Sequence, residues 1–112
     1  MTISKAEASM RVINLKIEGR LDALEAPGLR EAIGEQLSEG PTSLIIDLSE
    51  VEFVDSAGLA ALVKGMKDAR RGGGDLRIVS PAAEDAMWVF KLTRFDKVFA
   101  MFDTLEAAQR GW

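Results

Sequence analysis

The chain contains no cysteine and no histidine among its 112 residues. The absence of cysteine excludes disulfides, zinc–thiolate sites and thiol nucleophiles, and nothing in the composition requires an oxidising compartment. The absence of histidine removes the commonest general base and metal ligand, and with them any Ser-His-Asp triad. Because few groups remain for hydrolytic chemistry, we predict a protein that is not an enzyme and that holds neither a metal nor a cofactor.

Long hydrophobic runs are also missing. No uninterrupted run exceeds five residues, the length of residues 59–63 and 86–90, whereas a membrane-spanning helix needs roughly 20. The first ten residues include Glu7 and no apolar signal segment, so the cytoplasm is the expected location. The net charge of −4 does not provide the basic surface that nucleic-acid binding requires. Neither a membrane nor a nucleic acid is therefore expected as a partner.

Hydrophobic residues make up 47% of the chain and charged residues 29%, which is typical of one soluble domain that spans residues 1–112. Alternating or continuous apolar residues predict strands at residues 2–8, 10–19, 43–48, 76–79 and 98–102. Helical periodicity and capping residues predict helices from Ala26 for about 13 residues, over Ala57–Arg71, after Ser80-Pro81, and from Asp103-Thr104 to near Gln109. This alternation predicts an α/β fold with a mostly parallel mixed sheet of about four to five strands, against which the helices pack.

The most informative segment is residues 47–59, in which a buried strand leads through a short loop to the start of a helix. Asp55 or Ser56 is expected at the N-cap, where a side-chain oxygen accepts hydrogen bonds from free backbone N–H groups. The helix start would expose Ser56 where the partial positive charge of the helix tolerates a phosphate. Taken alone, such a pair is more often a cap with no further role.

The same segment resembles the signature of anti-sigma factor antagonists, the STAS domain family. Residues 55–59 match its Asp-Ser-x-Gly-Leu at the head of a helix, and residues 19–22 resemble its first strand-to-helix turn. Residues 91–108 resemble its C-terminal stretch, so the similarity covers about residues 10–110. Arg94 departs from the pattern, because the family usually has glycine at this position. The resemblance therefore leaves the conformation of the loop around Arg94 open.

The resemblance implies that Ser56 is a phosphoacceptor. The unphosphorylated domain would bind an anti-sigma factor serine kinase and free the sigma factor. The kinase would then use ATP to phosphorylate Ser56 and end the complex, and a metal-dependent serine phosphatase would reset the switch. Asp22 matches a family aspartate near the serine, and it either contacts the partner or forms the turn that follows the strand.

Three further residues are candidates for partner binding. Asp55 adjoins the phosphoacceptor, and Gly58 either lets a partner approach closely or eases the helix start. Trp88 falls on the outer face of the helix after Pro81, where it marks a contact surface or lies flat on its own domain. We expect the isolated chain to be a monomer.

Three other functions compete with this one. A serine hydrolase would need Gly-x-Ser-x-Gly and a histidine, and the chain has neither around Ser56. A receiver domain would use Asp47 as phosphoacceptor, but its acidic pair for Mg²⁺ would have to come from Glu18 and Asp22, which are separated. A STAS domain can also be a constitutive subunit, for instance of a lipid-transport complex, with no phosphate on the serine.

Overall fold

The computed structural model describes residues 1–7 and 11–112 of the chain. Within these residues five strands form one sheet: β1 (Thr2–Glu7), β2 (Val12–Leu21), β3 (Ser43–Val54), β4 (Leu76–Val79) and β5 (Ala100–Phe102). The helices are α1 (Ala26–Leu37), α2 (Ser56–Arg71), α3 (Glu84–Leu92) and α4 (Leu105–Gln109), with a short 3-10 helix, η1 (Phe95–Lys97). The strand order is β1-β2-β3-β4-β5, and β1 runs antiparallel to β2 while the other neighbouring pairs are parallel.

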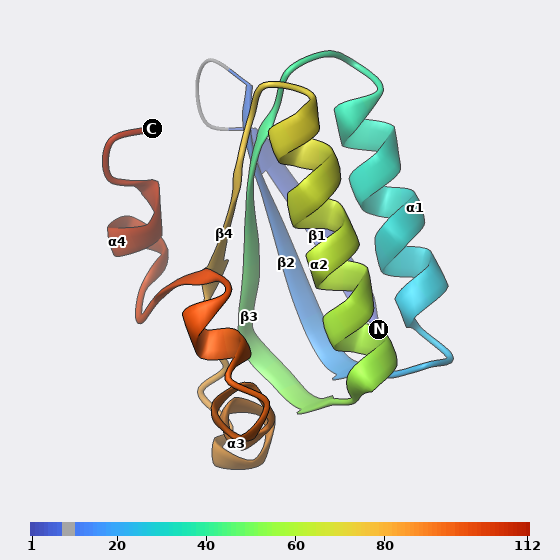
Figure 1. Ribbon diagram of the computed structural model, residues 1–112, viewed down its shortest axis with the longest axis vertical. Helices are drawn as coiled ribbons and strands as arrows, with labels where there is room; N and C mark the ends of the chain where they lie inside the picture. The colour runs from blue at the N-terminus through green and yellow to red at the C-terminus, as the bar shows by residue number, and fades with distance from the viewer. Residues whose placement is uncertain (8–10) are drawn as a thin grey trace.

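Helices cover the two faces of the sheet unequally. The long helices α1 and α2 lie side by side on one face (Figure 1). The short helix α4 packs on the other face, where its Ala108 joins Val12, Ile45 and Val79 in a small apolar cluster. Successive side chains of a strand point to opposite faces, so β3 contributes to both layers. The ends of α1 and α2 are thereby fixed relative to the ends of the strands.

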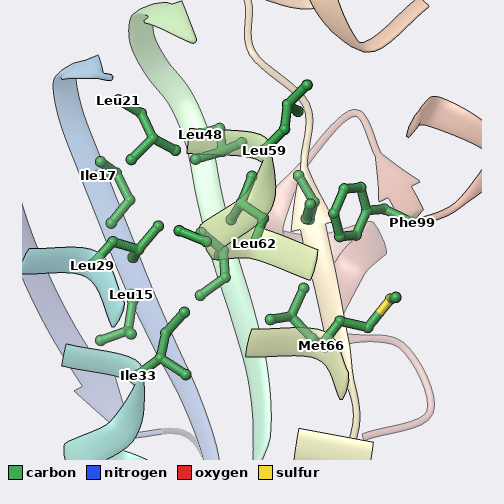
Figure 2. Packing of buried hydrophobic residues seen from close by; sticks show 14 of the residues in the cluster. Leu15, Ile17, Leu21, Leu29, Ile33, Leu48, Leu59, Leu62, Met66 and Phe99 are labelled. Carbon is green, nitrogen blue, oxygen red and sulfur yellow. The ribbon is translucent and has the colours of Figure 1, made fainter. Parts of the chain in front are cut away.

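The main core lies between the sheet and the pair α1 and α2. Leu15, Ile17 and Leu21 of β2 point toward Leu29 and Ile33 of α1, and α2 adds Leu59, Leu62 and Met66 (Figure 2). At roughly 25 cal/mol for each Å² of apolar surface removed from water, this layer dominates the stability of the fold. It also holds the first turn of α2 firmly against the end of β2, which matters for the site described below.

The predicted α/β fold with a mostly parallel mixed sheet is confirmed. The predicted strand ends at residues 8 and 10 lie outside the described residues. None of the helices in residues 1–7 and 11–112 is long and apolar enough to cross a membrane.

One predicted element is longer in the structure. The short loop expected after Leu48 is instead the second half of β3, which continues to Val54. The parallel register with β2 slips near Gly19, so that Gly19 pairs with Val51 and Arg20 with Phe53. This irregularity leaves Glu52 and Phe53 next to each other on the surface while Val51 and Val54 stay buried. A break in strict alternation hid this strand from the sequence pattern.

The helix expected directly after Ser80-Pro81 begins later, at Glu84, with Ala83 at its N-cap. Ser80 is not the cap because the helix begins four residues after it. Its N–H instead donates a hydrogen bond to the Phe102 carbonyl, 2.8 Å away, and continues the pairing of β4 and β5. Ala82 N–H then donates to the Ser49 carbonyl at 3.3 Å, which ties the segment to β3 before the helix starts.

Arg94, the position where the STAS signature usually has glycine, adopts a left-handed backbone conformation with φ of +62°. The loop therefore keeps a geometry that suits glycine, at a cost to arginine. We expect Arg94→Gly to raise the free energy of unfolding by about 0.5–1 kcal/mol, measured by urea denaturation.

Arg11 provides the matched control, because its φ is also positive, at +58°. Its guanidinium donates to the Gln36 carbonyl at 2.9 Å and to Thr42 Oγ1 at 3.3 Å, and so tethers the end of α1. Arg11→Gly should therefore lower stability. A loss of stability in Arg94→Gly would contradict the argument from backbone strain.

Candidate functional site

The turn after β2 and the turn after β3 meet at one edge of the sheet. They do so because parallel neighbouring strands place their carboxyl ends at the same edge, and here Leu21 pairs with Val54. The backbone N–H of Asp55 donates to the Leu21 carbonyl at 3.2 Å and continues the pairing one residue past the strand. The two turns therefore form one surface.

Asp55 joins these turns with its side chain. It caps α2, where its Oδ1 accepts a hydrogen bond from Gly58 N–H at 3.0 Å. Its Oδ2 accepts another from Ala23 N–H at 3.0 Å, across to the turn after β2. The prediction of an N-cap at Asp55 or Ser56 is confirmed for Asp55. The second hydrogen bond gives Asp55 a further role, since it fixes the position of the residues around Asp22.

Gly58 is buried against the end of β2. A Cβ built on it would lie 2.4 Å from the Leu21 carbonyl oxygen and 2.9 Å from Leu21 Cγ. Glycine is therefore needed because the backbone of Leu21 approaches Gly58 closely. Gly58 thus has a positioning role beneath the site, and a contact between Gly58 and a partner stays a prediction.

Ser56 is the first residue of α2 and is exposed to solvent. It stands where backbone N–H groups at the start of the helix create partial positive charge. Its neighbour Asp55 is held on two sides, so the backbone that presents the Ser56 hydroxyl is well fixed. Ser56 therefore presents an accessible hydroxyl at the partially positive end of a helix.

Asp22 shapes the turn between β2 and α1. Its Oδ1 accepts hydrogen bonds from the N–H groups of Leu24 and Glu25, each at 3.1 Å, and Arg20 Nε donates to Oδ2 at 3.3 Å. Burial raises the pKa of Asp22, but the hydrogen bonds from the Glu25 backbone and from Arg20 outweigh burial and hold the pKa below its ordinary value of 3.8. Asp22 is thus ionised at neutral pH, and its predicted role as a turn former is confirmed.

Two apolar side chains flank Asp22 and Asp55, and the sequence reasoning did not identify them. Leu24 is 85% exposed in the turn before α1, and Phe53 is 36% exposed at the end of β3. The guanidinium of Arg20 lies 4.1 Å from the centre of the Phe53 ring, in a cation–π contact. The available signal was Leu24 itself, a large apolar residue between Asp22 and Glu25 in a turn. Exposed apolar groups beside fixed charges are typical of a protein contact surface.

An open groove of about 600 Å³ begins at Ser56 and follows α2. On the opposite side from α2 it is lined by Thr93 and Phe95, at the junction of α3 and η1. Trp88 is 60% exposed, as predicted. It lies on α3 in a separate hollow with Glu84, Met87 and Lys91. The structure therefore brings Asp22, Asp55, Ser56 and Gly58 together and does not add Trp88 to them.

The position of Asp47 does not suit the phosphoacceptor of a receiver domain. Asp47 lies within β3 and not at its end, and it is 8% exposed. Its Oδ1 accepts a hydrogen bond from Ser49 N–H at 2.9 Å. In the part of the chain that the structure describes, no group of three or more acidic side chains could hold a metal ion.

Known proteins resemble the chain over nearly its whole length. The STAS domain model matches residues 4–108. The anti-sigma-F factor antagonist RsfB of Mycobacterium tuberculosis is 37% identical over 98 residues, which cover 87% of this chain and 78% of the relative. A crystal structure of an anti-sigma factor antagonist from Mycobacterium paratuberculosis is 31% identical, with a TM-score of 0.80 over 96% of this chain and 91% of that one. A Thermotoga maritima protein assigned as an anti-sigma factor antagonist is 26% identical, with a TM-score of 0.84 over 95% of this chain and 90% of that one.

Proposed function

This chain belongs to the STAS domain family of anti-sigma factor antagonists, and from that premise we propose a phosphorylation switch at Ser56. In its unphosphorylated form the protein binds an anti-sigma factor that is a serine kinase, and the sigma factor is freed. Phosphorylation of Ser56 ends the complex. Anti-sigma factor antagonists are regulators and not enzymes, so the protein acts through binding. The observation that carries the proposal is an exposed Ser56 at the start of α2, beside two hydrogen-bonded aspartates.

The proposed contact surface combines charge with apolar area. Asp22 stays ionised at neutral pH and is fixed by the turn, so it suits a basic side chain of the kinase. Leu24 and Phe53 supply the exposed apolar surface on either side. Interfaces of this kind derive affinity from buried apolar anchors and orientation from fixed charges.

The proposed chemistry is phosphoryl transfer from ATP bound to the kinase. The Ser56 oxygen attacks the γ-phosphorus, the bond from that phosphorus to the β–γ bridging oxygen breaks, and ADP leaves. The hydroxyl proton passes to a base of the kinase. This chain contributes the nucleophile and its position, since the hydrogen bonds of Asp55 hold the backbone at Ser56. A metal-dependent serine phosphatase restores the hydroxyl by hydrolysis.

The protein is proposed to work in the cytoplasm, as a monomer when alone. Its partners are the kinase and the phosphatase, and neither a nucleic acid nor a membrane takes part. The order of events requires that the kinase meets the unphosphorylated form and the phosphatase meets the phosphorylated form. Both enzymes must therefore reach the same end of α2.

Asp22→Asn tests this contact surface. Asparagine keeps the Oδ1 acceptor that shapes the turn and removes the charge. We expect affinity for the serine-kinase anti-sigma factor to fall about tenfold, which corresponds to about 1.4 kcal/mol, because a charge that faces a basic partner group is lost. Isothermal titration of the kinase with wild type and variant measures the change.

Asp103→Asn is the matched control, since Asp103 is exposed in the turn before α4 and loses the same charge. Its affinity should equal that of wild type. Absence of any binding by the wild-type chain to serine-kinase anti-sigma factors would overturn the proposed function. Equal affinities for wild type, Asp22→Asn and Asp103→Asn would show that Asp22 is not part of the contact surface.

A further inference from the structure

The groove that begins at Ser56 continues along the whole of α2, well beyond the two turns of the site. Its lining residues on α2 recur every three or four positions and so form one stripe: Ser56, Leu59, Ala60, Val63, Lys64, Lys67, Asp68 and Arg71. A helix of 16 residues is about 24 Å long at roughly 1.5 Å per residue. The groove is therefore straight, and it is long enough for several turns of a second helix.

The half of the groove near Ser56 is apolar and the far half is basic. Leu59, Val63 and Phe95 provide apolar lining, and Phe95 is supported by an edge contact with Phe99 at 6.1 Å between ring centres. Lys64, Lys67 and Arg71 provide three positive charges farther along α2. An apolar floor with charges on one side is the pattern that binds an amphipathic helix.

A single carboxylate offsets these cations. Asp68 accepts hydrogen bonds from Lys64 Nζ at 2.9 Å and from Arg71 Nη1 at 3.1 Å. The hydrogen bond from Lys64 and the nearby charge of Arg71 hold the pKa of Asp68 below its ordinary value of 3.8, so that it is ionised at neutral pH. Among residues 1–7 and 11–112, Lys67 forms no ion pair. The groove thus carries a net positive charge on a chain whose net charge is −4.

We propose that this groove docks an acidic amphipathic helix of the anti-sigma factor, with apolar residues on Leu59, Val63 and Phe95 and carboxylates toward Lys67 and Arg71. The inference rests on the proposed function and adds the chemistry of the partner. The partner then presents a basic group to Asp22 at one end and acidic groups to α2 at the other. Such opposed charges fix the orientation of the complex.

A helix docked in this groove also supplies a reason for release. Ser56 lies at the apolar end of the groove, so its phosphate would stand beside the apolar residues of the docked helix. The phosphate adds about −1.5 to −2 charge, and a charge that loses its water without gaining a partner is costly.

The test reverses the charges in the groove. Lys67→Glu/Arg71→Glu should lower affinity for the kinase at least tenfold in low salt, and the loss should shrink as salt is added. Lys5→Glu/Lys91→Glu has the same change in net charge at exposed positions outside the groove and should bind nearly as wild type does. Thermal unfolding of each variant establishes that the protein is folded at the titration temperature.

A second variant should change affinity for the kinase in the opposite direction. Asp68→Asn removes the one negative charge in the groove and frees Lys64 and Arg71, and it should raise affinity about threefold. It costs little stability, since an exposed ion pair contributes about 0–1 kcal/mol. A gain in Asp68→Asn with a loss in Lys67→Glu/Arg71→Glu supports the acidic helix.

The outcomes separate this inference from the function on which it rests. If wild type binds the kinase and both groove variants bind as tightly as wild type, the groove is not the docking site while the proposed function stands. Tighter binding by Lys67→Glu/Arg71→Glu would mean that the helix is basic, which also overturns the inference. If wild type itself does not bind, the proposed function fails.

Discussion

Gly58→Ala is expected to destabilise the protein by about 1–3 kcal/mol, the range for an overpacked interior. The added Cβ would meet the Leu21 carbonyl oxygen at 2.4 Å. That oxygen cannot retreat easily, because it also accepts the hydrogen bond from Asp55 N–H at 3.2 Å. Relief of the clash must therefore shift the start of α2, and Ser56 moves with it.

Gly34→Ala is the matched control. Gly34 lies inside α1, and a Cβ built on it would meet nothing within 4 Å. Alanine exceeds glycine in helix propensity by about 0.8–1.0 kcal/mol, so Gly34→Ala should stabilise the protein by roughly that amount. Urea denaturation of both variants measures the difference. Stabilisation by Gly58→Ala would show that the packing of α2 against β2 is looser than the structure indicates.

Phosphorylation of Ser56 should lower affinity for the serine-kinase anti-sigma factor by at least about 100-fold, equivalent to roughly 2.7 kcal/mol. Two unit charges 4 to 6 Å apart repel by about 3 to 4 kcal/mol at the effective dielectric of a partly buried site. Asp55 is the adjacent residue, and its Oδ2 reaches across to Ala23 beside Asp22. The repulsion is screened in the free protein and becomes strong when a partner covers the site.

The same phosphate should hardly change the stability of the free protein. Ser56 is exposed at the start of α2, and the helix dipole offsets the added charge by about 0.3–1 kcal/mol. The melting temperature of the phosphoprotein is therefore expected within a few degrees of the unmodified value. Titration calorimetry and thermal unfolding on one phosphorylated sample separate the two effects.

Ser4→Asp serves as a control for Ser56→Asp, because Ser4 is exposed on the edge strand β1. Ser56→Asp should reproduce part of the loss in affinity and Ser4→Asp none of it. Equal affinity of the phosphorylated and unphosphorylated proteins would exclude a switch that works by repulsion at Ser56.

Much of the fold was predictable because its patterns are local. Ile13, Leu15 and Ile17 alternate with polar residues, and all three are buried on one face of β2. The continuous apolar run at Leu44–Ile46 indicated a central strand, and β3 is central and buried on both faces. Asp55 was predictable as a cap because its side chain satisfies backbone groups within the next turn.

The remaining features depend on contacts between distant parts of the chain. The hydrogen bond from Ala23 to Asp55 joins residues 32 positions apart, and the carbonyl that Gly58 faces belongs to Leu21. The groove is lined by α2, from the middle of the sequence, and by Phe95, from its C-terminal part. The exposure of Trp88 followed from helical periodicity, but its separation from Ser56 depends on where α3 packs.

The measurement that tests the central claim most directly is the intact mass of wild type and Ser56→Ala after incubation with ATP and lysate from the source organism. The account predicts a single phosphate on wild type and none on Ser56→Ala. If neither protein gains mass with lysate from any growth condition, the phosphorylation switch is contradicted, and a constitutive STAS subunit becomes the better explanation.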